Sequence, residues 1–200
     1  MSKSISINIK FFLITFLLLV ARGCDFYSTS LWFFDNPSGE QNLLYRLAGF
    51  GWTGLILSNS ILVALIMYCF YYYTFKYTVD QLSTMPKGLT DYISKRYFNQ
   101  AGLFYQVFYK TPKNKNTFLG HIGYVLIRVA IFGSLLATIH NLGQYYNLPA
   151  YNTFRELVGR PLYVIYGLIG ASFVCFQYLL WNKEFQSAKL YFDSVNPNTK

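Results

Sequence analysis

Charged residues are scarce in this chain. Only 12% of its 200 residues are Asp, Glu, Lys or Arg, about half the share of a typical soluble domain. The deficit is concentrated in long apolar runs, which are typical of membrane-spanning segments. The composition therefore predicts an integral membrane protein.

Acidic residues are the rarer of the two signs. Eight Asp and Glu stand against 17 Lys and Arg, which gives a net charge of +9. The basic residues lie at the edges of the apolar runs, as topology signals do. No zinc-finger spacing, glycine-rich phosphate loop or RNA-binding aromatic motif accompanies them, so we expect no nucleic-acid partner.

Cysteine and histidine are also few. Cys24, Cys69 and Cys175 lie far apart, in or at the ends of apolar runs, and are expected to be free thiols packed as small hydrophobic residues. His121 and His140 lie at opposite ends of one run and cannot share a metal on a straight helix. No catalytic triad, carboxylate pair or Cys-His pair is evident. We expect no cofactor or metal, and an enzyme is the less favoured class.

Apolar sequence is what the chain has in abundance, at 54% hydrophobic and 20% aromatic residues. A helix needs about 20 apolar residues to cross a bilayer. The runs predict an all-α integral membrane protein, a four-span helical bundle forming a single membrane domain over residues 1–200. The predicted spans are about 11–34, 47–70, 118–140 and 162–181.

The first span has an alternative interpretation as a cleaved signal peptide. Lys10, a short apolar core and the segment 21–24 loosely fit a cleavage box. Arg22 does not suit such a site, and the apolar run continues beyond Cys24 as far as Phe34. A membrane span is therefore favoured.

The connection 76–117 contains an amphipathic pattern between Leu89 and Tyr109. Apolar residues recur there at three- and four-residue spacing: Leu89, Tyr92, Ile93, Tyr97, Ala101, Phe104, Tyr105 and Phe108. The spacing predicts an amphipathic helix on the cytoplasmic membrane surface. A small helix packed on the ends of the spans is the alternative, and the two are compatible.

Orientation follows from the distribution of the 17 basic residues. Twelve lie in the two terminal segments and the 76–117 connection, against Arg46, Arg155 and Arg160 on the other side, with Arg22 and Arg128 inside spans. The positive-inside rule places both termini in the cytoplasm. The Tyr-, Phe- and Asn-rich composition suits an AT-rich bacterial genome, so we expect a bacterial inner membrane; the alternative is the mitochondrial inner membrane of a protist.

Polar residues inside the spans are the candidate site. Arg22, Asp25 and Thr29 are spaced three and four apart, so they share one helix face, and Asn59 and Arg128 fall near the same depth. Charge in hydrocarbon costs several kcal/mol, so such residues usually face a partner or a cavity. Arg22, Asp25, Asn59 and Arg128 form the midplane polar layer. It is either an internal ion pair that holds helices together or the lining of a ligand site. Arg128 either meets a ligand or extends toward the cytoplasmic surface.

One sequence pattern resembles a known family. Asp25-x-x-x-Thr29, followed by Glu40-x-Asn42 and a Gly- and Trp-rich second span, resembles the uncharacterised bacterial membrane proteins of the DUF5658 type. Those often have proline after the asparagine, which this chain lacks. The resemblance covers the first third of the chain and brings no activity. It implies that Asp25, Thr29, Glu40 and Asn42 form one polar cluster in the outer half of the first two spans.

Two functions follow from these patterns. The lack of a catalytic arrangement favours a non-enzymatic scaffold, assembly factor or accessory subunit that contacts a membrane protein or another copy of itself. Gly133-x-x-x-Ala137 and Gly167-x-x-x-Ala171 predict close contact between the third and fourth spans. The alternative is a small transporter or lipid-handling protein that uses the midplane polar layer, with anionic membrane lipids as partners.

Overall fold

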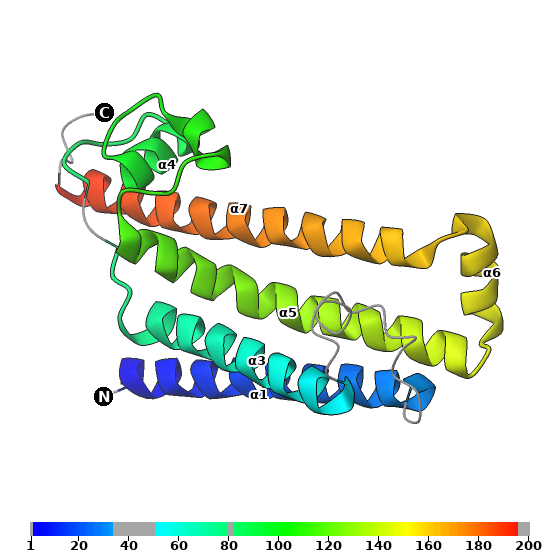
Figure 1. Cartoon of the computed structure of the whole chain (residues 1–200). Helices are drawn as coiled ribbons and strands as arrows, with labels where there is room; N and C mark the ends of the chain where they lie inside the picture. The colour runs from blue at the N-terminus through cyan, green and yellow to red at the C-terminus, as the bar shows by residue number, and fades with distance from the viewer. Residues whose placement is uncertain (1, 34–50, 80–81, 196–200) are drawn as a thin grey trace. The chain divides into compact units, whose positions relative to one another are not determined.

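A computed structural model describes residues 2–33, 51–79 and 82–195, with side chains from residue 6 to 31 and from 52 onward in the last two segments. All regular elements in these segments are helices, which confirms the all-α prediction (Figure 1). In chain order they are α1 (Ser2–Phe33), α3 (Gly51–Phe75), α4 (Leu89–Phe98), the 3₁₀ helix η2 (Phe104–Phe108), α5 (Lys115–Tyr145), α6 (Pro149–Val158) and α7 (Pro161–Val195).

Four helices in the described part of the chain are long and apolar enough to cross a membrane. Their candidate spans are Ser6–Leu31, Trp52–Phe75, Lys115–Tyr145 and Pro161–Val195. Each coincides with one predicted span, although residues 34 and 47–50 of the first two predictions lie outside the described residues. Helix α7 begins at a proline, whose missing N–H and preset φ suit the first helical position.

The surfaces of these helices are apolar. Phe12 on α1 is 69% exposed and Val174 on α7 is 67% exposed, and many other large apolar side chains are exposed in the same way. Water would make such broad apolar faces prone to association, whereas hydrocarbon accommodates them. The helices therefore suit a multi-pass membrane protein.

The three cysteines are free, in agreement with the prediction. Cys24 and Cys175 are exposed and only Cys69 is half-buried. The expectation that all three are packed as small hydrophobic residues is therefore wrong for Cys24 and Cys175, which are exposed on α1 and α7.

The chain divides into two compact units, described separately below. Unit 1 comprises residues 1–68 and 126–173, and unit 2 comprises residues 69–125 and 174–200. The helices α3, α5 and α7 each contribute one part to each unit, so the division does not coincide with ends of helices.

Small residues set the helix contacts of unit 1. A Cβ atom added to Gly133 of α5 would lie 3.3 Å from Ile169 Cδ1 of α7, so this glycine permits the predicted contact between the two helices. One added to Gly143 would lie 2.6 Å from the ring of Tyr151, so α6 packs closely on α5. Gly167 has open space around it. The second small-residue motif therefore does not take part in the α5–α7 contact, contrary to the prediction.

Unit 2 has an aromatic core built around α4. Its buried residues Tyr92, Ile93, Tyr97 and Phe98 pack against residues of α7 that include Trp181, Phe185 and Ala188. Figure 1 shows α4 lying alongside the C-terminal part of α7. This contact explains why α7 continues as a helix to Val195, well beyond the predicted end near residue 181.

The predicted continuous helix from residue 89 to 109 is wrong. Helix α4 ends at Phe98, where Asn99 adopts the left-handed conformation with φ of 59°, and Gly102 follows with φ of 76°. The chain turns back there because Leu103, Phe104 and Val107 cover the same core that α4 forms. The packed alternative therefore describes α4, and its location at a membrane surface stays a prediction.

The connection from residue 140 to 160 contains a helix that the sequence analysis did not predict. Helix α6 begins at Pro149 and ends at Val158, and the capping residue Gly159 has a φ of 67°, which favours glycine. Tyr151, Phe154 and Val158 lie three and four apart, so they give this short helix one apolar face.

Candidate functional site

Arg22 of α1 is the centre of a polar cluster in unit 1. Its Nη1 atom donates to Asp25 Oδ2 at 2.9 Å and to Ser134 Oγ of α5 at 3.2 Å. Its Nη2 atom donates to Asn59 Oδ1 of α3. The structure therefore brings together three of the four residues of the midplane polar layer and adds Ser134, which the sequence analysis missed.

Side chains on three helices accept hydrogen bonds from the guanidinium group of Arg22. The i, i+3 spacing on α1 places the Asp25 carboxylate beside Arg22, while Asn59 is oriented by donating to the Leu55 carbonyl at 2.8 Å. The side chains of Arg22 and Asp25 remain 25% and 17% exposed. A paired charge that keeps part of its surface open can hold helices together and still face a cavity.

A second polar group lies on the same face of α1. Asn141 of α5 donates to Ser28 Oγ and to Thr29 Oγ1, both at 3.1 Å. Ser28 is fully buried and donates in turn to the Asp25 carbonyl at 2.9 Å. Thr29 therefore joins the site through Asn141, a residue that sequence reasoning did not single out because it falls at the end of the third apolar run.

The remaining predicted site residues have different outcomes. Arg128 lies on α5 and is half-buried, but it is not among the residues that line the cavity described next. Glu40 and Asn42 lie outside the described residues, so their membership of the cluster stays a prediction.

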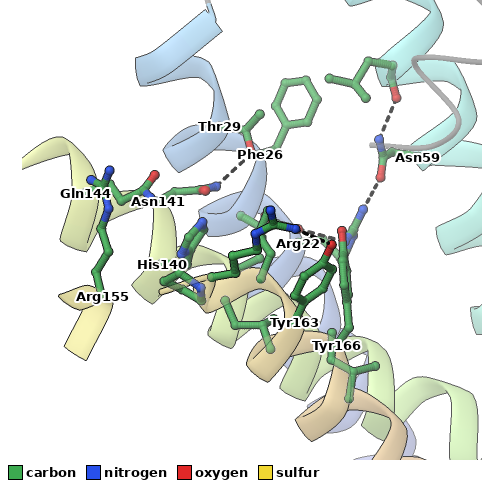
Figure 2. A pocket seen from close by; sticks show the side chains of 18 of the residues that line it. Arg22, Phe26, Thr29, Asn59, His140, Asn141, Gln144, Arg155, Tyr163 and Tyr166 are labelled. Atoms are coloured by element: carbon green, nitrogen blue, oxygen red, sulfur yellow. Dashed lines mark hydrogen bonds and ion pairs between the residues drawn. The ribbon is translucent and has the colours of Figure 1, made fainter. Parts of the chain in front are cut away.

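A cavity of about 1000 Å³ lies beside Arg22 within unit 1 (Figure 2). This volume reaches the upper end of the range of small-molecule sites, about 300–1,000 Å³. Residues from α1, α3, α5, α6 and α7 line it. Its polar and charged lining residues are Arg22, Asp25, Thr29, Asn59, His140, Asn141, Gln144, Arg155, Arg160, Tyr163 and Tyr166.

The charges of the described residues around this cavity are unbalanced. Arg22 is paired with Asp25, whereas neither Arg155 nor Arg160 forms an ion pair with a described residue. Arg160 lies over the ring of Tyr163, with Cζ 5.6 Å from the centroid, and donates to its hydroxyl at 3.2 Å. The described lining of the cavity therefore carries excess positive charge where α6 is connected to α7.

Unit 2 contains a buried polar network around His121. The His121 Nε2 atom lies 3.0 Å from Glu184 Oε2 and 3.1 Å from the Tyr77 hydroxyl, and Nδ1 is hydrogen-bonded to the Tyr97 hydroxyl. The Glu184 carboxylate also accepts from Tyr77 at 2.9 Å and from Tyr92 at 3.0 Å. His121 is 1% exposed, so the centre of this network lies in the interior of unit 2.

Arg96 joins this network from α4. It is 3% exposed and donates to the Tyr77 hydroxyl at 3.1 Å and to the Thr78 carbonyl at 3.3 Å. Arg96 is not one of the residues of the apolar pattern between Leu89 and Tyr109, yet it is buried with several of them. Gln177, Trp181 and Glu184 lie four and three residues apart on α7, a periodicity that could have indicated this network.

The geometry Tyr97–His121–Glu184 has the order of a nucleophile, a base and a carboxylate. Burial, strengthened by the nearby Glu184 charge, raises the pKa of Tyr97 well above the ordinary tyrosine value, which disfavours the phenolate. Tyr97 is also 5% exposed and accepts a hydrogen bond from Trp181 Nε1 at 3.2 Å. The arrangement is therefore better explained as a structural network that fastens α4 to α5 and α7.

The described residues contain no group of three or more His, Cys, Asp or Glu placed to hold a metal ion. His140, the second histidine, is buried and its Nδ1 atom is hydrogen-bonded to the Tyr151 hydroxyl of α6. Its role in the structure is to join α5 to α6 at the edge of the cavity.

Comparison with known protein families, with curated proteins and with solved structures finds no match for this chain. The resemblance to the DUF5658 type therefore stays a prediction, and the site described above is interpreted from its own geometry.

Proposed function

We propose that this chain is a multi-pass membrane protein that binds a small amphiphilic molecule, a lipid or a lipid-like compound, in the cavity of unit 1. The observation that carries the proposal is the cavity of about 1000 Å³ with a polar lining on helices that are apolar enough to cross a membrane. This is the lipid-handling alternative of the sequence analysis, and the cavity is what favours it.

The lining has two chemical characters, as an amphiphile requires. Phe26, Leu55, Ile165 and Ile169 supply apolar surface, and the polar residues named above supply hydrogen-bonding groups. Ligand sites are typically mostly apolar with a few polar groups that set orientation. The pairing of Arg22 with Asp25, Asn59 and Ser134 gives that cluster a structural role, which leaves the rest of the polar lining for the ligand.

The proposed function requires binding and no chemical step. We combine this function with the orientation that the charge distribution predicts, with both termini in the cytoplasm and α6 on the opposite side of the membrane. In that orientation the cavity would take up or hold its ligand in the outer half of the bilayer.

A cavity-filling substitution tests the proposal. Ala137 lines the cavity, so Ala137→Trp should occupy part of it, whereas Ala171→Trp on the exposed face of α7 serves as the matched control. Native mass spectrometry of the purified protein in detergent should show bound lipid on the parent chain and on the control, and less on Ala137→Trp. Thermal unfolding verifies that both variants are folded. Equal lipid retention by the two folded variants would contradict the proposal.

The scaffold or accessory-subunit function is the second candidate. The observation that favours it is the open space around Gly167 and Gly170 on the exposed face of α7, which another membrane helix could approach closely. Gly167→Leu should then remove a co-purifying membrane protein or a second copy of the chain without changing lipid retention. Loss of lipid alone would favour the binding function.

A further inference from the structure

We infer that the ligand of the unit 1 cavity carries a phosphomonoester group and that Arg155 and Arg160 bind it. This inference rests on the proposed function, since it names the chemistry of the molecule that the cavity takes. The shared chemistry is a terminal phosphate, whether it belongs to a lipid headgroup or to a free phosphate compound.

The charge of the described lining is the first argument. Three arginines, Arg22, Arg155 and Arg160, stand against one carboxylate, Asp25, so the lining carries a charge of 3 − 1 = +2 with His140 neutral. The opposite charges of Arg22 and Asp25 cancel in their ion pair, in which the two atoms are 2.9 Å apart. The two positive charges left over belong to Arg155 and Arg160, and neither forms an ion pair with a described residue.

The position of these two arginines is the second argument. Arg155 lies in the last turn of α6, and Arg160 directly precedes α7. The turn between them depends on Gly159, whose φ of 67° is strained for other residues. The turn therefore holds both guanidinium-bearing residues at one end of the cavity, together with the amino-terminal turn of the 35-residue helix α7, which is the positive end of its dipole.

Neutral donors lie in the same region. Figure 2 shows Arg155 reaching from α6 toward Gln144 of α5, with Asn141 and His140 nearby on the same helix. The Gln144 amide can supply an N–H group beside the guanidinium of Arg155, which suits an anion with several acceptor oxygens. The Asn141 amide already donates to Ser28 and Thr29. The end of the cavity thus combines charge with hydrogen-bond donors from α5, α6 and α7.

Charge matching selects the phosphomonoester among anionic groups. A phosphomonoester carries about −1.5 to −2 at pH 7 and three strong acceptor oxygens. A carboxylate or a phosphodiester carries a single charge and would leave one arginine uncompensated in a cavity bounded by apolar helices. Arginine also binds phosphate in a bidentate manner, which lysine does not reproduce.

The experiment measures binding of a lipid series by native mass spectrometry of the full chain in detergent. The probes share dioleoyl chains and differ in the headgroup: phosphatidic acid, phosphatidylglycerol and phosphatidylcholine. We expect phosphatidic acid to bind most tightly, and Arg155→Gln combined with Arg160→Gln to weaken its binding at least about tenfold while leaving phosphatidylcholine unchanged. Lys113→Gln in unit 2, which also removes a basic charge, should leave the whole series unchanged.

Two further arms identify the source of the phosphate. Inorganic phosphate and glycerol 3-phosphate are added as competitors against phosphatidic acid. Displacement at equal concentration would show that a free phosphate compound is the ligand, and resistance to displacement would show that the acyl chains contribute and the ligand is a lipid. Arg155→Lys combined with Arg160→Lys should restore only part of the binding.

The outcomes separate this inference from the proposed function. If all three lipids bind equally and the double glutamine variant matches the parent chain, while Ala137→Trp still loses lipid, the phosphomonoester inference is overturned and the binding function stands. If Ala137→Trp retains every lipid, the binding function itself fails. Thermal unfolding of each variant verifies folding, which we expect to be unchanged because Arg155 and Arg160 are exposed.

Discussion

Individual charged residues in this protein are stabilised by groups from helices far away in the sequence. Arg22 is satisfied by Asp25 on its own helix and by Asn59 and Ser134 on two others. Glu184 accepts hydrogen bonds from Tyr77 and Tyr92, which precede it in the sequence by 107 and 92 residues. Removing one member of such a group leaves the others desolvated, so these residues are where single substitutions should have their largest effects.

Asp25→Ala should destabilise unit 1 because it removes the carboxylate that neutralises Arg22. Breaking a buried pair costs about 3–5 kcal/mol, and we expect about 3 kcal/mol because Arg22 retains Asn59 and Ser134 and is partly exposed. Unfolding in detergent measures the change. Adding Arg22→Leu should recover much of the loss. Rescue by Arg128→Leu instead would identify Arg128 as the partner, and unchanged stability of Asp25→Ala would show that the pair is not structural.

Glu184→Gln should weaken the attachment of α4. The substitution keeps the size of the side chain but replaces one acceptor oxygen with an amide nitrogen, so a hydrogen bond from Tyr77, Tyr92 or His121 is lost. We expect a loss of about 1–3 kcal/mol in the free energy of unfolding. Glu156→Gln on the exposed face of α6 is the matched control and should change stability by no more than about 0.5 kcal/mol. Equal effects of the two substitutions would show that the His121 network contributes nothing.

At the scale of helices, the spacing between elements depends on where small residues are buried. In unit 2, Gly123 of α5 packs directly against the backbone carbonyl of Cys69 in α3. In unit 1, Gly143 packs against Tyr151, which lets α6 lie on α5. Gly167 also lies in a helix, yet a Cβ atom added to it would meet none of the described residues within 4 Å. The role of each glycine therefore follows from its neighbour and not from its presence in a helix.

Gly123→Ala and Gly167→Ala form a matched pair that tests this difference. An added Cβ at residue 123 would collide with the Cys69 carbonyl oxygen, which cannot move without a shift of α3. We expect a destabilisation of about 1–3 kcal/mol, as for overpacked cores. Gly167→Ala meets open space and should be neutral or stabilising by up to about 1 kcal/mol because alanine favours helix. Thermal unfolding of both variants decides, and similar effects would refute the packing of α3 on α5.

At the scale of the whole molecule, the charge distribution predicts one orientation in the membrane. Lys and Arg are concentrated in the terminal segments and in the 76–117 connection, whereas the 140–160 connection has only Arg155 and Arg160. The positive-inside rule assigns the first group to the cytoplasm. Arg155 and Arg160 line the cavity, so this assignment decides on which side of the membrane the proposed ligand site lies.

Cysteine labelling tests the orientation. In a chain with Cys24, Cys69 and Cys175 replaced, a single cysteine at Asn152 should react with a membrane-impermeant maleimide added outside. One at Lys113 should react only after the membrane is permeabilised. The reverse pattern would place the α6 side in the cytoplasm and overturn the predicted topology.

The sequence by itself determined the features that depend on local order. Long apolar runs predict the four helices because backbone hydrogen bonds in hydrocarbon must be satisfied within each segment. The i, i+3 spacing of Arg22 and Asp25 predicts their ion pair, and Pro161 predicts the start of α7. Each of these depends on residues within about one helical turn, so no knowledge of neighbouring helices is needed.

Only the tertiary structure decided which polar residues meet. Ser134, Asn141 and the pair His121–Glu184 join partners 63 to 113 residues away, and the cavity draws on five helices. A helix that is apolar on all sides has no single stripe to show which face turns toward its neighbours. Its rotation about its own axis, and hence the set of residues that face inward, is decided by packing contacts between helices such as those at Gly123 and Gly133.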